Sequence, residues 1–117
     1  MGSRRVVVLM MVAWVSLAVW SSPAAGQRPS PEEGQRIYKQ NCSNCHGSAG
    51  QGDGVAAAQL DPKPADLTAT KTQGKNDAEL LEVIKFGRPG TAMPSWMSEL
   101  DERDMRHVLA YIRSLVP

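Results

Sequence analysis

Both cysteines of this 117-residue chain lie three positions apart, and one of its two histidines follows the second cysteine directly, in the stretch QNCSNCHG of residues 40–47. Two thiols and an imidazole at this spacing could form a disulfide, act as a dithiol redox pair, bind a metal ion or hold a cofactor by covalent bonds. These uses of Cys42, Cys45 and His46 make different demands on the rest of the chain, so the surrounding sequence discriminates among them.

Three of these uses find little support. A thioredoxin-like redox pair lies between a strand and a helix, and no strand pattern precedes Cys42. A zinc site needs four ligands, and the only His besides His46 is His107, far along the chain on the polar side of the last predicted helix. A disulfide between residues three apart closes so small a loop that it constrains little of the unfolded ensemble.

The pattern C-x-x-C-H is typical of covalent attachment of a c-type haem, which uses every residue of the motif. Each thiol adds to one vinyl group of the macrocycle, so the two cysteines must lie close together, and His46 is then carried under the iron as an axial ligand. We therefore predict one haem c, bound covalently through Cys42 and Cys45, with His46 as an iron ligand.

Three methionines follow the motif as candidates for the second axial position: Met93, Met97 and Met105. Met105 lies on the apolar stripe of the last predicted helix, where we expect it to fill the core. Met93 lies in an irregular stretch between Gly90 and Pro94, where no helical face accounts for an apolar residue. A thioether is a recognised haem ligand that raises the reduction potential when paired with histidine. We predict that Met93, rather than Met97, binds the iron.

The elements that must position these residues are helices. Ser30 as N-cap and Glu33 three residues later predict a helix that runs to about Asn41. Asn76 or Asp77 is suited to cap a second helix, because a run with apolar residues on one face follows. No segment shows the sustained alternation of a strand. The sequence predicts an all-α domain with three to five short helices and long loops.

A last helix is predicted after Asp101, because apolar residues recur there at helical spacing with charged residues opposite: Met105, Val108, Leu109, Ile112 and Leu115. Between the helices, four glycines in residues 47–54 and prolines at 62 and 64 predict a long irregular loop. Such a loop in a small domain is typically functional or wrapped around a ligand.

The amino terminus has the pattern of an export signal. Arg4 and Arg5 precede the fifteen-residue run Val6–Trp20, in which only Ser16 is polar, and small residues follow up to Gly26. The alternative is a retained membrane anchor, but the apolar run is shorter than the roughly 20 residues that span a bilayer core. We expect residues 1–26 to be a cleaved signal peptide and residues 27–117 to form the folded domain.

Charge and size exclude one class of function and favour a bound cofactor. The chain has 13 basic and 12 acidic residues, and without Arg4 and Arg5 the balance is 11 against 12, or −1. That balance excludes nucleic-acid binding as the main function. The remaining domain of about 90 residues has a marginal hydrophobic core without a staple or a cofactor.

Taken together, the motifs of residues 34–115 resemble a class I, monohaem cytochrome c of bacterial type, similar to the cytochrome c domains of cbb3-type oxidases. The matching stretches are Gly34 to Tyr38, CSNCHG at 42–47, GQGDG at 50–54, PADL at 64–67, GRPGTAMPSW at 87–96 and VLAYI at 108–112. The resemblance implies a cytochrome c fold in which the first and last helices cross, with Gly34 facing Tyr111. It also implies a haem lying between loops, with His46 and Met93 as axial ligands.

The resemblance further implies which residues surround the haem. Members of this family orient the proximal imidazole through a proline carbonyl, which places Pro62 or Pro64 near His46. Trp96 corresponds to an aromatic residue near a haem propionate, although packing in the core explains it equally well. Arg88 is a weaker candidate for a contact with the propionates.

The predicted function is electron transfer in the periplasm, by a protein that turns over no substrate itself. With both axial positions filled, the iron has no open site for oxygen or peroxide chemistry. The expected partners are redox proteins such as a dehydrogenase, an oxidase or a cytochrome complex, with no nucleic acid, and with a membrane only if the amino-terminal segment is retained. The alternatives are a haem subunit permanently bound to a dehydrogenase or terminal oxidase, and a haem-based gas sensor in which Met93 dissociates.

Overall fold

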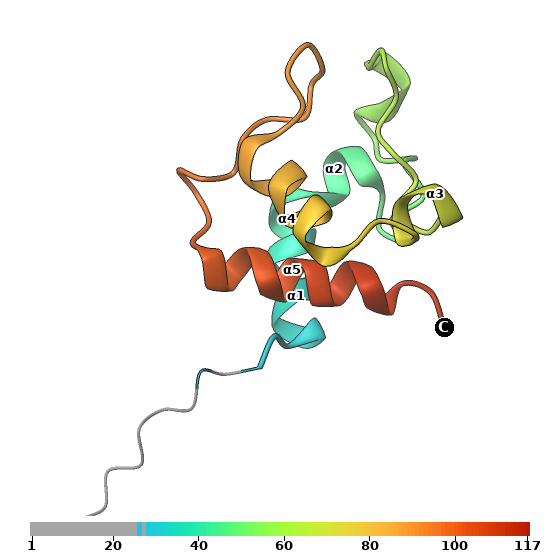
Figure 1. The fold of residues 1–117 in the computed structure, drawn as a ribbon. Coiled ribbons are helices and arrows are strands. Elements are labelled where there is room, and N and C mark those ends of the chain that lie inside the picture. Colours follow the sequence, from blue (N-terminus) through green and yellow to red (C-terminus); the bar gives the residue numbers. More distant parts are fainter. Residues whose placement is uncertain (1–25, 27) are drawn as a thin grey trace, which may run out of the picture.

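The computed structural model describes residues 26 and 28–117. These residues form five α-helices, one 3-10 helix and no strand (Figure 1), in the order α1 (Pro31–Asn41), α2 (Ser43–His46), η1 (Ala57–Gln59), α3 (Thr70–Gln73), α4 (Asp77–Phe86) and α5 (Glu102–Ser114). The predicted all-α class is confirmed. The predicted signal peptide lies outside the described residues except for Gly26, and in the part of the chain that the structure describes no helix is long and apolar enough to cross a membrane.

The three longer helices begin where the sequence places their caps. The side chains of Ser30 and Asp101 each accept a hydrogen bond from a backbone amide in the first turn of α1 and α5. The cap of α4 is Asn76 rather than Asp77, and it forms a reciprocal capping box with Glu79, with bonds of 2.8 and 2.9 Å. The one-turn helices α2 and α3 were not predicted, because four residues are too few to produce a helical pattern of apolar residues.

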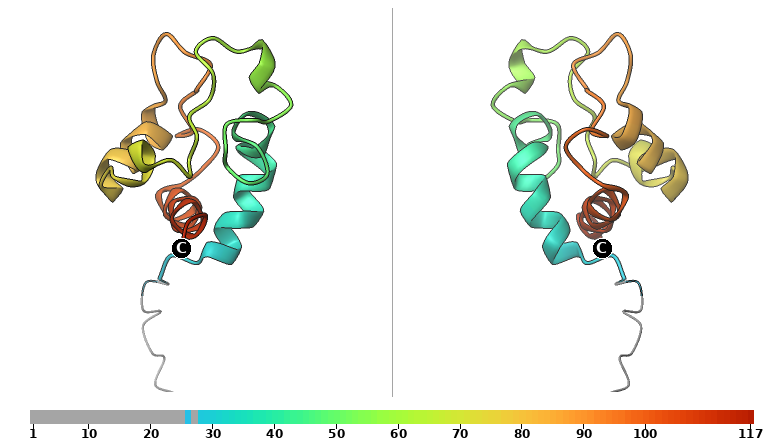
Figure 2. Two further views of the ribbon diagram at one scale, coloured as in Figure 1. Left: turned by 90° about the vertical axis from the view of Figure 1, so that its right-hand side faces the viewer. Right: turned by 90° about the vertical axis from the view of Figure 1, so that its left-hand side faces the viewer.

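Helices α1 and α5 cross in direct contact, and Gly34 lies at the crossing (Figures 1 and 2). A Cβ atom built on Gly34 would lie 2.9 Å from the Cβ of Tyr111 and 2.5 Å from the carbonyl carbon of His107. The rings of Tyr38 and Tyr111 pack beside this point with centroids 5.0 Å apart. The expectation that Gly34 faces Tyr111 is confirmed, since no larger residue permits this approach of the two helices.

The core lies between these two helices, α4 and the loop that carries Leu67. Its buried members are Ile37, Tyr38, Leu67, Ile84, Leu100, Met105, Val108, Tyr111 and Ile112. The apolar stripe predicted for α5 is therefore buried, apart from Leu115, which is half-buried and packs against the cluster. The core is small, as expected for a domain of this length.

His107 is the main error in the prediction of α5, because it is buried rather than on a polar face. Its side chain is 3% exposed, and its Nδ1 atom accepts a hydrogen bond of 2.8 Å from the backbone amide of Ser30. The physical reason is the close crossing at Gly34, which brings the start of α1 over a part of α5 that an isolated amphipathic helix would leave in water. The crossing thus widens the buried face of α5.

Two long loops rise on the side of the molecule that faces away from α5, as all views show (Figures 1 and 2). One loop, residues 47–69, follows the CSNCH stretch and contains η1; the other, residues 87–101, connects α4 to α5 and contains Met93. The fold therefore brings α2, which carries His46, and the two loops to the same side.

Candidate functional site

The CSNCH stretch forms the end of α1 and the single turn of α2. The amide of Cys42 donates to the carbonyl of Tyr38 at 2.8 Å, and the amides of Cys45 and His46 donate to the carbonyl of Cys42 at 3.2 and 2.9 Å. Side chains three residues apart on one helical turn lie on the same face. Both thiols are half-buried and neither is in a disulfide, so the turn presents them together to one ligand.

The surroundings of Cys42 favour an uncharged sulfur. Burial raises the pKa of Cys42 to about 12, and the neighbouring Cys45 adds to this effect. Without a bound cation, the thiolate of Cys42 is therefore disfavoured at neutral pH. A thioether has no proton to lose and is buried without this penalty. In residues 26 and 28–117, moreover, no group of three or more His, Cys, Asp or Glu side chains is placed to hold a metal ion.

His46 is fixed in the tautomer that leaves one ring nitrogen available to a metal. Its Nδ1 atom lies 2.9 Å from the carbonyl oxygen of Ala65. A carbonyl oxygen only accepts hydrogen bonds, so Nδ1 carries the proton and Nε2 holds the free lone pair. Burial lowers the pKa of His46, and the bond to Ala65 opposes this effect only in part. The imidazole is thus neutral at neutral pH, with Nε2 as its ligating atom.

The partner of His46 is Ala65, so the expectation of a proline carbonyl, from Pro62 or Pro64, was wrong. The carbonyl of Pro64 is instead directed at Gly52, where a built Cβ atom would lie 2.6 Å from the oxygen. Because successive carbonyls of an extended segment point in different directions, a shift of one residue exchanges the group that faces the imidazole. The sequence placed the correct loop near His46 but did not determine its register.

The glycine-rich loop closes over the end of α2. The last carbonyls of a helix have no partners within it, and here three amides of the loop supply them, with bonds from Gly52 to His46, Gly54 to Cys45 and Ala56 to Asn44 of 2.8, 3.1 and 3.0 Å. A built Cβ atom on Gly54 would lie 2.7 Å from the carbonyl carbon of Cys45. This loop therefore holds the C-x-x-C-H motif by backbone contacts, which explains its glycines.

The loop that carries Met93 is folded back on itself. The amide of Arg88 donates to the carbonyl of Met93 at 3.1 Å, and the amide of Met93 donates to Thr91 Oγ1 at 3.2 Å. The Thr91 hydroxyl donates in turn to the carbonyl of Arg88 at 2.8 Å. Gly87, with φ of 69°, allows the close return, since a Cβ atom there would lie 2.5 Å from the carbonyl carbon of Pro94. Met93 is half-buried and held at a defined position.

The other predicted residues occupy different environments. Met97 is 52% exposed and Met105 is 3% exposed in the core, which agrees with the role in packing predicted for Met105. Trp96 is half-buried against the core, and its amide donates to the carbonyl of Ile84 at 3.2 Å. Arg88 is exposed.

The residues of this site fit a covalently attached haem. Two thiols lie on one turn, the next residue is a neutral imidazole with a free Nε2, and a half-buried thioether lies on a loop that rises on the same side (Figure 2). Covalent attachment of a c-type haem uses two thiols, and an imidazole and a thioether are both recognised ligands of haem iron. Cys42, Cys45, His46 and Met93 are the residues that would hold it.

Comparison with protein families gives one match that covers most of the chain. Residues 29–112 match the model of the family described as cytochrome C oxidase, cbb3-type, subunit III. Cytochrome c55X of Paracoccus denitrificans (strain Pd 1222) is 32% identical over 107 residues, which are 89% of each chain. The cbb3-type cytochrome c oxidase subunit CcoP of Azospirillum brasilense is 31% identical over 84 residues, which are 72% of this chain but only 28% of that subunit.

Solved structures give the same fold. A chain of the Kuenenia stuttgartiensis reducing HAO-like protein complex is 32% identical, with a TM-score of 0.68 over 80% of this chain and 48% of that one. The KustC0563 c-type cytochrome is 20% identical, with a TM-score of 0.61 over 72% of this chain and 98% of that one. The arrangement of the helices is thus that of c-type cytochromes.

Proposed function

We propose, from the premise that this chain belongs to the cbb3-type cytochrome c oxidase subunit III family, that it carries single electrons on one haem c bound through Cys42 and Cys45. Domains of this family transfer electrons on a c-type haem. The chain has only two cysteines, which suffice for one covalently attached haem. The proposal therefore specifies one haem for the whole chain.

The observation that carries the proposal is the tautomer of His46. Its Nδ1–H donates to the carbonyl of Ala65, so Nε2 is free to bind iron, and this hydrogen bond orients the ring and raises its basicity. Met93 is the proposed second ligand because its loop fixes it on the same side of the molecule. When bound, the haem supplies reversible one-electron chemistry between the ferric and ferrous states. His46 and Met93 would be the residues that hold the iron, and two protein ligands would keep small molecules off it, so the proposed role is that of a carrier and not of an enzyme.

The proposed setting is the periplasm, reached through the signal peptide of residues 1–26 that the sequence predicts, with residues 27–117 as the mature domain. The proposed partners are redox proteins of a respiratory chain, a dehydrogenase, an oxidase or another cytochrome. Support for such partners comes from the relatives, which include subunits of cbb3-type oxidases and a chain of an HAO-like complex.

A second candidate is a haem subunit bound permanently to such an enzyme. The observation that favours it is that the matched part of the oxidase subunit CcoP is 28% of that protein, so this domain also occurs within larger assemblies. Purification of the exported protein under mild conditions separates the two: a freely diffusing carrier elutes alone, and a permanent subunit elutes with its enzyme. A gas sensor, the third candidate, would differ by rapid binding of CO to the reduced protein.

The intact mass of the exported protein, produced with the machinery that attaches haem, tests the proposal. We expect the mass of residues 27–117 plus one haem. Replacing Cys42 by Ala should lower the fraction of protein that retains haem in denaturant, and replacing both Cys42 and Cys45 should leave mostly apo-protein with little helix, because burial of the haem is part of folding this small domain. A wild-type protein without covalent haem, or a double variant that stays fully helical without it, would contradict the proposal.

A further inference from the structure

The segment that orients His46 is itself held by two side chains of α3. Residues 65–67 have no regular structure, and their three successive carbonyls all have partners. The carbonyl of Ala65 accepts from His46, that of Asp66 accepts from Thr72 Oγ1 at 2.8 Å, and that of Leu67 accepts from Gln73 Nε2 at 2.7 Å. Neighbouring side chains of one helix turn therefore fix the two peptides that follow the carbonyl facing the imidazole.

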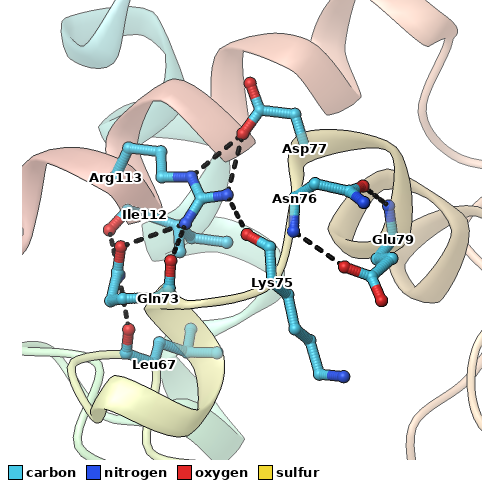
Figure 3. A network of polar contacts seen from close by, with 8 residues as sticks. All are labelled: Leu67, Gln73, Lys75, Asn76, Asp77, Glu79, Ile112 and Arg113. Atoms are coloured by element: carbon cyan, nitrogen blue, oxygen red, sulfur yellow. Dashed lines mark hydrogen bonds and ion pairs between the residues drawn. The ribbon is translucent and has the colours of Figure 1, made fainter.

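The same glutamine connects this segment to α5 (Figure 3). Gln73 Nε2 also donates to the carbonyl of Ile112 at 3.1 Å, while Arg113 Nη1 donates to the Gln73 carbonyl at 2.7 Å and lies 3.3 Å from Gln73 Oε1. Arg113 further bonds the carbonyl of Lys75 and pairs with Asp77 at 2.9 Å. A helix of one turn is unstable by itself, so α3 depends on these bonds to α5 for its position.

We propose that Thr72 and Gln73 are positioning residues for His46, which set the strength of its hydrogen bond to Ala65 by holding residues 65–67 in place. The proposal rests on the proposed function, since it concerns His46 as an iron ligand. A further contact of the segment, from the Leu67 amide to the carbonyl of Gly50 at 2.6 Å, leads back to the loop that closes over α2. Residues 65–67 are thus held on one side by α3 and on the other by the glycine-rich loop that contacts the C-x-x-C-H motif.

Losing this support has a defined consequence for the imidazole. A hydrogen bond at Nδ1 makes a ligating histidine more basic, and a more basic ligand favours ferric iron. When Gln73 no longer holds the Leu67 carbonyl, the segment relaxes away from the ring and the bond to Ala65 weakens. We expect the reduction potential to rise and the Nδ1 proton of His46 to exchange with solvent about two- to tenfold faster, the factor that corresponds to one ordinary hydrogen bond.

The test uses the full-length holoprotein and two independent variants. Gln73→Met keeps the length of the side chain but removes its donor, and Thr72→Val keeps the shape of the buried threonine but removes its hydroxyl. The matched control is Asn76→Ala, which removes the cap of α4 beside the same network, where the Asn76 side chain is hydrogen-bonded to Glu79 rather than to the segment of residues 65–67 (Figure 3). All three substitutions should lower Tm by a similar amount, since a cap and a hydrogen bond contribute comparably to stability.

The expected result is that Gln73→Met and Thr72→Val raise the potential, accelerate exchange of the His46 Nδ1 proton in NMR and alter the paramagnetic shifts of the haem methyl groups, whereas Asn76→Ala changes only Tm. If both variants matched Asn76→Ala in potential, exchange and shifts while the wild type had normal His46 ligation, the positioning role would be refuted and the electron carrier would stand. A wild-type protein without a His46-ligated haem would refute both.

Discussion

The close crossing of α1 and α5 makes Gly34→Ala the most informative test of the fold. The added methyl group would lie 2.9 Å from Tyr111 Cβ and 2.5 Å from the carbonyl carbon of His107, and closer still to the carbonyl oxygen. Both groups belong to a helix and do not rotate away. To reach ordinary van der Waals separation from that oxygen, α1 must move by about 1.5 Å from α5 across a close-packed contact. That movement also loosens the Tyr38–Tyr111 contact and the bond from Ser30 to His107.

Two opposing terms set the size of the effect. Alanine favours a helix over glycine by about 1 kcal/mol. Overpacking of a well-packed core costs about 1–3 kcal/mol. The cost of Gly34→Ala should lie at the upper end of this range, because the added methyl group would meet backbone atoms of α5. We expect the free energy of unfolding of the holoprotein to fall by about 2 kcal/mol, which for a domain of this size lowers Tm by about 10 °C.

The assay is guanidinium unfolding of the holoprotein, followed by far-ultraviolet circular dichroism. The control is the neighbouring exposed residue Gln35, where Gln35→Ala should be about 1 kcal/mol more stable than Gln35→Gly because only helix propensity acts there. At position 34 the order should be reversed, so that the protein with glycine is more stable than the protein with alanine. If Gly34→Ala were as stable as the wild type, or more stable by the margin found at Gln35, the reasoning about the crossing would be refuted.

Three further substitutions test the core and the haem-attachment turn. Met105→Ala should lower the free energy of unfolding by about 2–5 kcal/mol because it leaves a cavity in the core, whereas Met97→Ala, at an exposed position, should change it by less than about 0.5 kcal/mol; equal effects would contradict the assignment of Met105 to the core. Tyr38→Phe removes a bond of 2.7 Å to the carbonyl of Gly47 and should cost about 0.5–1.5 kcal/mol, because one ordinary hydrogen bond is lost while that carbonyl keeps its bond of 3.2 Å from the Gly50 amide. Burial raises the pKa of Tyr38 above its ordinary value of 10.0, so the folded protein holds this proton more tightly than the unfolded chain does, and stability should fall as the pH rises above that value. This alkaline decrease should be smaller in Tyr38→Phe, and an unchanged decrease in a pH series of unfolding curves would contradict the buried environment of the phenol.

The sequence predicted those features that local patterns encode. Caps such as Ser30 and Asp101 and the spacing of apolar residues depend on contacts within one helix, so the three longer helices were found. The C-x-x-C-H motif is likewise local, and its residues predicted the cofactor that the family match supports. The glycines around the motif predicted a loop wrapped around a functional element.

The features that were missed depend on contacts between distant segments. His107 was placed in water because the position of α1 over α5 cannot be read from the pattern of α5 alone. The partner of His46 is a backbone carbonyl, which every residue has, so nothing in the sequence distinguishes Ala65 from Pro64. The same holds for Gln73, a polar residue in a one-turn helix, whose role follows only from the carbonyls that it contacts.

The proposal that His46 and Met93 are the axial ligands is tested most directly by the absorption spectrum of the oxidised holoprotein, compared with Met93→Ala and Met97→Ala. We expect the weak near-infrared band of histidine–methionine ligation in the wild type and in Met97→Ala. In Met93→Ala the band should disappear, the reduced iron should bind CO readily, and the potential should fall, because a thioether stabilises the ferrous state. Loss of the band in Met97→Ala but not in Met93→Ala would contradict the ligand assignment, and a wild-type protein that lacks the band and binds CO readily would contradict the electron carrier itself.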